Sequence, residues 1–436
     1  MKSEAMEHQS QSIGFSAWIF IVYGFYYISG YSDQFHNYII MALFLLWALF
    51  ACLEDMNSFS KAIVTPSFLF LLLFVLYYFF TGVLKGGLIY TLEYVAVYLF
   101  LYGVTVQWRY YQLRNRVREI RLIVIALLVA FGVFAISAIL FYLRNPSAAR
   151  TLAADFYAFN NIAIGGGYPI AFGSAILIVY VFEMWIRREE AFCRKGIFVL
   201  MGLSLLIFLL LKTESTTTVI ATLLGIVAAC MYKIYYGNIG KTSNNRDLRK
   251  LITIALLLLV LVLVFMNLQN IGYKLMDMTA TNVDNIMARR INRIGQKLYF
   301  SETGQTYDNY VDERIGTIKL SWQTFCENPL FGVGHRCGNV FSELERLGVG
   351  THSEIFDTFA QFGLVGGGFW LIFMIVSLKN CTRHSKSKGY LWSLSIMLIF
   401  NPFKAFHGYV VLFFLIPAME YLFEHAGEER NNYGIE

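Results

Sequence analysis

Residues 327–367 read ENPLFGVGHRCGNVFSELERLGVGTHSEIFDTFAQFGLVGG, a polar, glycine-punctuated stretch that lies between long apolar runs. Over the whole chain 57% of the residues are hydrophobic and 15% are charged, and the mean hydropathy is +0.55. These values lie far from the averages of water-soluble proteins. The chain is therefore predicted to be a polytopic membrane protein, in which this polar stretch leads from an outer connection into a span.

Apolar runs recur along the chain and are long enough to cross a hydrocarbon core of about 30 Å, which takes roughly 20 helical residues. They predict twelve spans, at 13–31, 36–53, 66–84, 88–106, 121–143, 168–186, 196–211, 217–236, 251–269, 353–378, 389–404 and 408–423. The last two are short, and Pro402 and Pro417 interrupt them. The first span is long and follows a mixed-charge tail, a pattern that differs from a cleavable signal. The predicted fold class is all-α.

The Lys and Arg residues predict the orientation of the spans, because cytoplasmic loops of membrane proteins retain positive charge. With the N-terminus inside, most of the 35 Lys and Arg residues fall in inner connections. Both termini are then cytoplasmic. The expected domains are a transmembrane bundle at 1–269, an extracytoplasmic helical loop at 270–351, and a second bundle with a cytoplasmic tail at 352–436. The net charge of +6 follows from this topology and from headgroup contact, so no nucleic-acid partner is expected.

The outer segment is too long for a passive connection and is predicted to be a functional loop. In its first predicted helix, DNIMARRINRIGQKL at 284–298, Arg289, Arg293 and Lys297 recur every four residues, with Arg290 beside them. They share one helical face. Such a basic face suits a substrate phosphate, and it equally suits anionic lipid headgroups.

The second predicted helix of the outer segment is VDERIGTIKLSWQTF, residues 311–325. Its apolar residues recur at intervals of three and four, and its polar flank holds Arg314, Thr317 and Ser321. The apolar positions are Val311, Ile315, Ile318, Trp322 and Phe325. The helix is predicted to stop at Asn328-Pro329, because the residue before proline avoids helical angles. Gly332 and Gly334 then permit a tight return of the backbone.

His352 is the first candidate for a functional side chain. Thr351 and Glu354 form a capping-box pattern before an apolar run, which predicts His352 in the first turn of the next span. There the positive end of the helix dipole disfavours imidazolium, and a neutral histidine suits a general base near pH 7. A histidine that merely occupies an interfacial helix start fits the same pattern. His335, next to Arg336 in the glycine turn, is a candidate for substrate contact or a solvated turn residue.

Two of the six cysteines, Cys326 and Cys337, bracket the NPLFGVG turn on the predicted outer side. An oxidising compartment would allow a disulfide between them, closing a loop of about a dozen residues. Spacing alone does not establish the geometry that a disulfide requires.

Several of these features occur together in one known family. They are an arginine about fifteen residues before a proline, the NPLFGVG turn, a His-Ser pair and a helix containing GLVGG. The chain resembles the O-antigen polymerase and O-antigen ligase family of bacterial envelope enzymes. The family pattern corresponds here to Arg314, to residues 328–334, to His352-Ser353 and to residues 363–366.

A further stretch, RTLAADFYAFNNIAIGGG at 150–167, is similar to a family stretch in which an asparagine precedes a span. The resemblance makes Arg150 and Asn161 candidates for contact with the glycan or its phosphate. They are weaker candidates than His352 and Arg314.

A third stretch, KTESTTT at 212–218, looks like the T-x-S-R segment of the family, but Thr216 stands where a second functional arginine is expected. Lys212 or the Arg289–Arg293 cluster is the candidate substitute. Lys212 fits equally well as the partner of Glu214 in an interfacial salt bridge.

The resemblance implies a GT-C-like fold and an inverting, metal-independent glycosyl transfer on the outer face of the bacterial cytoplasmic membrane. The donor would be a glycan on polyprenyl (undecaprenyl) pyrophosphate, with no other cofactor. Arg314 would stabilise the anionic leaving group, because a guanidinium binds phosphate oxygens in pairs, with Arg289, Arg290 and Arg293 in support. His352 would take the proton of the acceptor hydroxyl. Implied partners are lipid-linked oligosaccharides, membrane lipids, a flippase and a chain-length regulator.

Polymerase and ligase share this chemistry and differ in their acceptor. A polymerase extends a lipid-linked repeat unit for O-antigen, capsule or exopolysaccharide, whereas a ligase transfers glycan to lipid A core or to protein. The pattern at 212–218 and the His-Ser pair favour the polymerase. Two non-enzymatic alternatives stay open, a transporter or flippase of lipid-linked glycans and a scaffold. The gathering of Arg and His in the outer loop, and the lack of an internal repeat, favour the enzyme.

Overall fold

The computed structural model describes residues 13–28, 36–86, 103–144, 168–186, 202, 206–207, 216–236, 268–279, 291–292, 295–296, 310–334, 347–350, 352–383, 388–400 and 406–433. Across these residues the regular structure is helical and includes no strand, which confirms the all-α prediction for this part of the chain. The helices are α1 (Phe15–Ile28), α2 (His36–Glu54), α3 (Met56–Ile63), α4 (Pro66–Gly86), α6 (Val117–Arg144), α8 (Tyr168–Ile186), α11 (Thr216–Tyr236), α13 (Leu268–Thr279), α15 (Tyr310–Glu327), α17 (Glu354–Thr382), α18 (Gly389–Phe400), α19 (Phe406–Val410), the π-helix η1 (Val411–Leu415) and α20 (Ile416–Tyr433). A further helical stretch covers residues 103–114.

Within the described residues, four helical segments are long and apolar enough to cross a membrane: Pro66–Val83, Val117–Phe141, Glu354–Thr382 and Gly408–His425. Five shorter apolar helices accompany them: Phe15–Tyr26, Ile39–Glu54, Ile170–Trp185, Thr217–Tyr232 and Gly389–Phe400. All of them coincide with predicted spans, and they support the prediction of a membrane protein. The predicted spans 88–106, 196–211 and 251–269 lie largely outside the described residues, so the twelve-span count and the GT-C-like architecture stay predictions.

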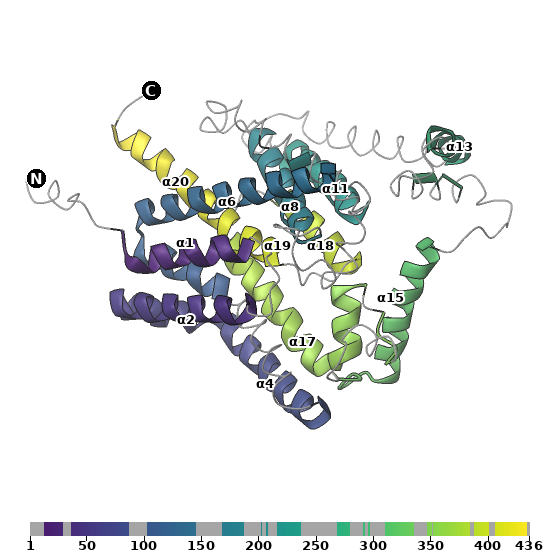
Figure 1. The fold of residues 1–436 in the computed structure, drawn as a ribbon, viewed down its shortest axis with the longest axis horizontal. Coiled ribbons are helices and arrows are strands. Elements are labelled where there is room, and N and C mark those ends of the chain that lie inside the picture. The colour runs from purple at the N-terminus through teal and green to yellow at the C-terminus, as the bar shows by residue number, and fades with distance from the viewer. Residues whose placement is uncertain are drawn as a thin grey trace, which may run out of the picture.

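Helix α17 connects the parts of the bundle (Figure 1). On one side α1 packs against α2 and α6, and on the other α8, α11 and α18 pack against one another. Helix α17 contacts α4, α18 and η1, and near its beginning it also packs against α15. It therefore joins α15 and its surroundings to the core of the molecule.

An ion cluster joins the beginning of α1 to α2, to helix 103–114 and to α6. Nη1 of Arg114 lies 2.6 Å from Oε2 of Glu54 and 3.4 Å from Oε2 of Glu119. The Gly14 N–H donates to Glu119 (2.9 Å), and the Ser16 N–H and hydroxyl donate to Glu54 (2.8 Å each). All five residues lie in or beside predicted inner connections, so their contact is consistent with the predicted alternation of span directions, which stays a prediction.

The chain continues as a helix through Pro417, one of the two predicted interruptions, from α19 through η1 into α20. Proline has no N–H and leaves the carbonyl of Phe413, four residues earlier, without its helical donor. The thiol of Cys381 on α17 donates to that carbonyl, with Sγ 3.7 Å from the oxygen. A π-helical turn is a common way to accommodate such a disturbance.

Candidate active site

Helix α15 (Tyr310–Glu327) carries Arg314 near its beginning, as the sequence predicts. The helix ends at Glu327, one residue before Asn328-Pro329, which confirms the predicted stop. The turn that follows has φ of 63° at Gly332 and 77° at Gly334, so both glycines occupy the backbone region predicted for them. The side chain of Arg314 lies outside the described part of the chain.

The packed face of α15 includes polar side chains. Ser321 and Thr324 are buried, with 0% and 5% of their surface exposed, whereas Trp322, on the apolar stripe, is 52% exposed. Polar side chains of the helix are therefore buried against the protein, while Trp322 contacts Phe356 of α17 and stays half exposed. The physical reason is that hydrogen-bonding partners from α17 and from residues 347–350 meet the polar side chains, which makes their burial favourable.

The carboxylate of Asp357 joins α15 to the beginning of α17. The Ser321 hydroxyl donates to Oδ1 (2.6 Å), and the Ser353 N–H donates to Oδ2 (2.8 Å). Ser321 also accepts from the Gly350 N–H (2.8 Å). Asp357, Ser321 and Ser353 are all buried. Each carboxylate oxygen has a donor and the serine both donates and accepts, so the network is satisfied and stiff.

The segment 347–350 runs directly along α15. Thr324 donates its hydroxyl to the carbonyl of Gly348 (2.6 Å), and a Cβ added to Gly350 would overlap the carbonyl of Thr317. Only glycine permits this approach. Thr317 follows Arg314 by three residues, and His352 follows Gly350 by two, so this contact brings the two candidate segments together.

His352 lies immediately before the helix cap and not within the first turn. The cap is Ser353, whose side chain accepts from the Phe356 N–H (3.2 Å), and α17 starts at Glu354. The predicted cap at Thr351 is therefore wrong, and the helix-dipole argument for His352 loses its premise. Ser353 is the N-cap because its hydroxyl accepts from the helix while its own N–H donates to Asp357. The imidazole of His352 is exposed, whereas its neighbours Ser353 and Glu354 are buried.

Helix α17 breaks at Gly363, where φ is 62° and ψ is −165°. This corrects the prediction of one uninterrupted span over 353–378. A break leaves backbone groups without helical partners, and the turn after α15 supplies them. Four backbone hydrogen bonds join the two: Val333 N–H to Ala360 O (3.0 Å), Gly334 N–H to Gln361 O (2.8 Å), Leu364 N–H to Pro329 O (2.8 Å) and Val365 N–H to Leu330 O (3.1 Å). Tyr77 of α4 adds a hydrogen bond from its hydroxyl to Phe331 O (2.6 Å).

Residues 201–371 of the chain match a family model described as O-antigen ligase. This match supports the resemblance of the chain to the O-antigen ligase and polymerase family. The matched region contains α15, the glycine turn, the cap and break of α17, and both Arg314 and His352. No curated protein matches the chain.

Most of the other candidate residues lie outside the described part of the chain. These are Arg150, Asn161, Lys212, Arg289, Arg290, Arg293, His335 and Cys337. Cys326 is exposed on α15, and its disulfide with Cys337 stays a prediction. Within the basic segment 284–298 the described residues 291–292 and 295–296 are helical, as predicted. Asn292 there donates to Met276 O (3.2 Å) and Thr279 Oγ1 (3.0 Å), which ties the segment to α13.

Sequence reasoning missed Asp357 as a site residue and assigned Ser321 only to a polar flank. A signal for Asp357 exists in the sequence, since an acidic residue one helical turn after a Ser cap can reach back to the cap N–H. Its second partner, Ser321, lies 36 residues away in the chain. No local pattern connects the two.

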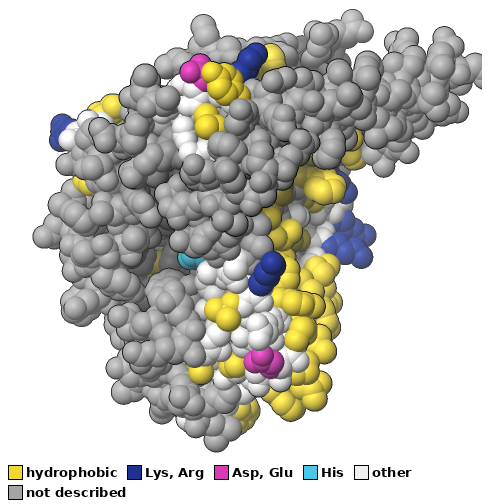
Figure 2. All heavy atoms as spheres, turned by 90° about the vertical axis from the view of Figure 1, so that its right-hand side faces the viewer, with side chains coloured by type: hydrophobic (Ala, Val, Ile, Leu, Met, Phe, Trp, Pro, Cys, Tyr) yellow, Lys and Arg dark blue, Asp and Glu magenta, His cyan; other side chains and the backbone are white. Residues whose placement is uncertain are grey.

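The surface beside this site is partly hydrophobic. Figure 2 shows the side of the molecule where α13 and α15 lie, with hydrophobic side chains gathered over part of it. Exposed hydrophobic side chains belong to α15, to the turn after it and to the break of α17: Trp322, Leu330, Phe331 and Leu364. Among the described residues no group of three His, Cys, Asp or Glu side chains could hold a metal ion, and metal independence stays an expectation.

Proposed function

We propose that the protein is a polysaccharide polymerase. It transfers a growing glycan from a polyprenyl pyrophosphate donor to a sugar hydroxyl of a lipid-linked repeat unit, in the synthesis of O-antigen, capsule or exopolysaccharide. The family match supports O-antigen polymerase or ligase activity in general; the donor, the acceptor and the choice of polymerase are the proposal.

In the proposed reaction the acceptor oxygen attacks the anomeric carbon of the donor sugar, and the bond from that carbon to the pyrophosphate oxygen breaks. The configuration at the carbon inverts, polyprenyl pyrophosphate leaves, and the acceptor proton passes to the imidazole of His352. Arg314 stabilises the negative charge that develops on the leaving group. Arg289, Arg290, Arg293, Lys212, Arg150, Asn161 and His335 are proposed substrate contacts.

The observation that carries this proposal is the clamp between α15 and the beginning of α17. Asp357, Ser321 and the backbone of Gly350 hold the segment that precedes His352 against the helix that carries Arg314. Catalysis by a base and an anion-stabilising group needs such fixed placement, because small displacements reduce the rate strongly. The exposure of His352 leaves it accessible to a substrate.

The hydrophobic surface of Trp322, Leu330, Phe331 and Leu364 supports a lipid-linked substrate. A polyprenyl chain is apolar, and its pyrophosphate must reach the enzyme from the edge of the membrane. We place the active site on the outer face of the bacterial cytoplasmic membrane, with both termini cytoplasmic. A flippase that delivers the repeat units and a chain-length regulator are the proposed partners, and no metal takes part.

The test is complementation of a polymerase-null strain that makes the matching repeat unit, with the glycan read as a ladder on a gel. Wild-type protein is expected to restore long chains, and His352→Ala or Arg314→Ala to give single repeats at equal membrane levels. His425→Ala removes a histidine on α20 and Lys319→Ala removes an exposed charge on α15, so both should keep the long ladder. Undiminished chains from His352→Ala would exclude it as the base.

A ligase is the second candidate, because the matched family model carries the description O-antigen ligase. The wild-type and variant genes are also introduced into a ligase-null strain that makes finished polymer. Polymer attached to lipid A core there, together with no ladder in the polymerase-null strain, would replace the polymerase by the ligase.

A further inference from the structure

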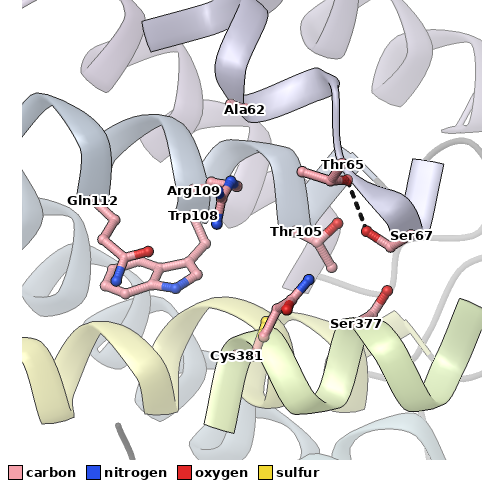
Figure 3. A pocket seen from close by; sticks show the side chains of 10 residues that line it. Ala62, Thr65, Ser67, Thr105, Trp108, Arg109, Gln112, Ser377 and Cys381 are labelled. Carbon is pink, nitrogen blue, oxygen red and sulfur yellow. Dashed lines mark hydrogen bonds between the residues drawn. The ribbon is translucent and has the colours of Figure 1, made fainter. Parts of the chain in front are cut away.

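A polar cavity lies at the other end of α17, away from His352. The residues that line it come from α17, from helix 103–114, and from the end of α3, the beginning of α4 and the connection between them (Figure 3). It is partly open to the surface, and the empty space among its lining residues, open solvent included, is about 350 Å³. Because His352 precedes α17 and this cavity adjoins its last turns, the cavity is separate from the candidate active site.

Hydroxyl groups from three segments surround the cavity. They belong to Thr65 and Ser67, whose oxygens are 2.8 Å apart, to Thr105, and to Ser377 of α17. Ser377 is 1% exposed, and its hydroxyl has no hydrogen-bond partner in the described part of the chain. A buried hydroxyl without a partner costs free energy unless a bound molecule satisfies it.

Arg109 gives the cavity its charge. Its Nε is buried without a hydrogen-bond partner, and it forms none of the ion pairs found among the described side chains. None of the residues that line the cavity is acidic. A cation among hydroxyl groups, together with the amide of Asn380, offers many donors and no carboxylate, which is the lining that an anion with several acceptor oxygens requires.

The position of the cavity indicates which kind of anion can reach it. It lies at the ends of apolar helices, between residues 62–67, 105–112 and 377–381, which are predicted to meet the inner surface of the membrane. Lipid phosphates are concentrated at this level. Arg109, the hydroxyls and Asn380 match the tetrahedral oxygens of a phosphate, and Trp108 supplies an apolar wall.

We infer that this cavity binds a phosphate group, supplied by a phospholipid headgroup or by free phosphate at the inner surface. The inference does not depend on the proposed polymerase activity. Ser377 and Arg109 would then gain partners that the described residues do not offer them.

The inference is tested on the full-length protein in detergent by native mass spectrometry and thermal unfolding. Phosphatidylglycerol is compared with diacylglycerol, which has the same tails and no phosphate, and inorganic phosphate is compared with chloride at equal ionic strength. Wild type should retain phosphatidylglycerol and unfold at a higher temperature with it than with diacylglycerol. Stabilisation by inorganic phosphate as well identifies free phosphate as a source, and stabilisation by the lipid alone identifies the headgroup.

Arg109→Gln is expected to weaken phosphatidylglycerol binding about tenfold or more, because the variant loses a charge-assisted hydrogen bond to the phosphate. Ser377→Ala removes a hydroxyl that has no partner among the described residues, so it should fold normally and weaken binding severalfold. Arg118→Gln removes an exposed arginine on the same predicted inner side and should bind as wild type does. The inference is overturned if wild type prefers neither phosphate compound, or if Arg109→Gln and Ser377→Ala both bind as Arg118→Gln does.

Discussion

Gly332 and Gly363 lie against each other at the point where the turn after α15 crosses the break of α17. A Cβ on Gly332 would stand 2.6 Å from the amide nitrogen of Gly363, and a Cβ on Gly363 would overlap the carbonyl of Leu330. Both have positive φ, 63° and 62°. The two glycine motifs that carry the family resemblance thus form a single backbone crossing, which supports the site and takes no part in its chemistry.

Gly363→Ala should destabilise the protein by about 2 kcal/mol or more, because its backbone angles are open only to glycine and the neighbouring backbone cannot move aside. Gly368→Ala, in the same helix, meets no atom within 4 Å and should be neutral or stabilising by up to about 1 kcal/mol. Thermal unfolding in detergent measures both. Equal stability of the two variants would refute the crossing as a structural requirement.

Ser321→Ala and Asp357→Asn should each cost about 1–3 kcal/mol, since each leaves buried partners unsatisfied. Both substitutions break the same network. The destabilisation of the double variant should therefore be smaller than the sum of the two single destabilisations by at least about 0.5 kcal/mol. The measurement is a double-mutant cycle of unfolding. The control is Gln323→Ala, whose exposed side chain donates to Glu327 of the same helix. Strict additivity would show that the two residues act independently.

Arg114→Gln should destabilise the protein by about 3 kcal/mol, because it leaves the carboxylates of Glu54 and Glu119 together without their shared cation. Their side chains are 18% and 3% exposed, and that of Arg114 is 4% exposed. The unfolding midpoint of Arg114→Gln should fall well below that of Arg118→Gln, in which the lost arginine is exposed. A similar midpoint for the two would mean that the cluster contributes little.

Asp55 caps α3, and its carboxylate accepts from the Ser58 N–H (3.0 Å), which lowers the pKa of Asp55 in the folded protein. A lowered folded pKa stabilises the fold above the unfolded pKa of about 4, and this contribution is lost as pH falls through the folded value. Asp55→Ala should therefore cost about 1 kcal/mol at neutral pH and less in acid. Asp55→Asn keeps a cap without a charge, so its stability relative to Asp55→Ala should not change with pH. Denaturant unfolding at two pH values tests both expectations.

Much of this architecture was readable from the sequence. Apolar runs predicted the positions of α1, α2, α4, α6 and α8, because a hydrocarbon core admits only long apolar helices. The end of α15 and the turn with Gly332 were also readable, because proline and glycine act on their immediate neighbours. Candidate residues Arg314 and His352 came from the family resemblance, and their roles stay predictions.

The tertiary structure alone decided how these elements meet. The burial of Ser321 depends on its hydrogen bond to Asp357. The cap of α17 is Ser353 and not Thr351, because the same carboxylate accepts from the Ser353 N–H. The backbone groups at the break at Gly363 are paired with the turn around Gly332. Sequence patterns report the preferences of one segment and are read over a few turns. A buried polar group is stable only with its partner, and when that partner lies tens of residues away, only the folded chain shows which side of a helix is inside.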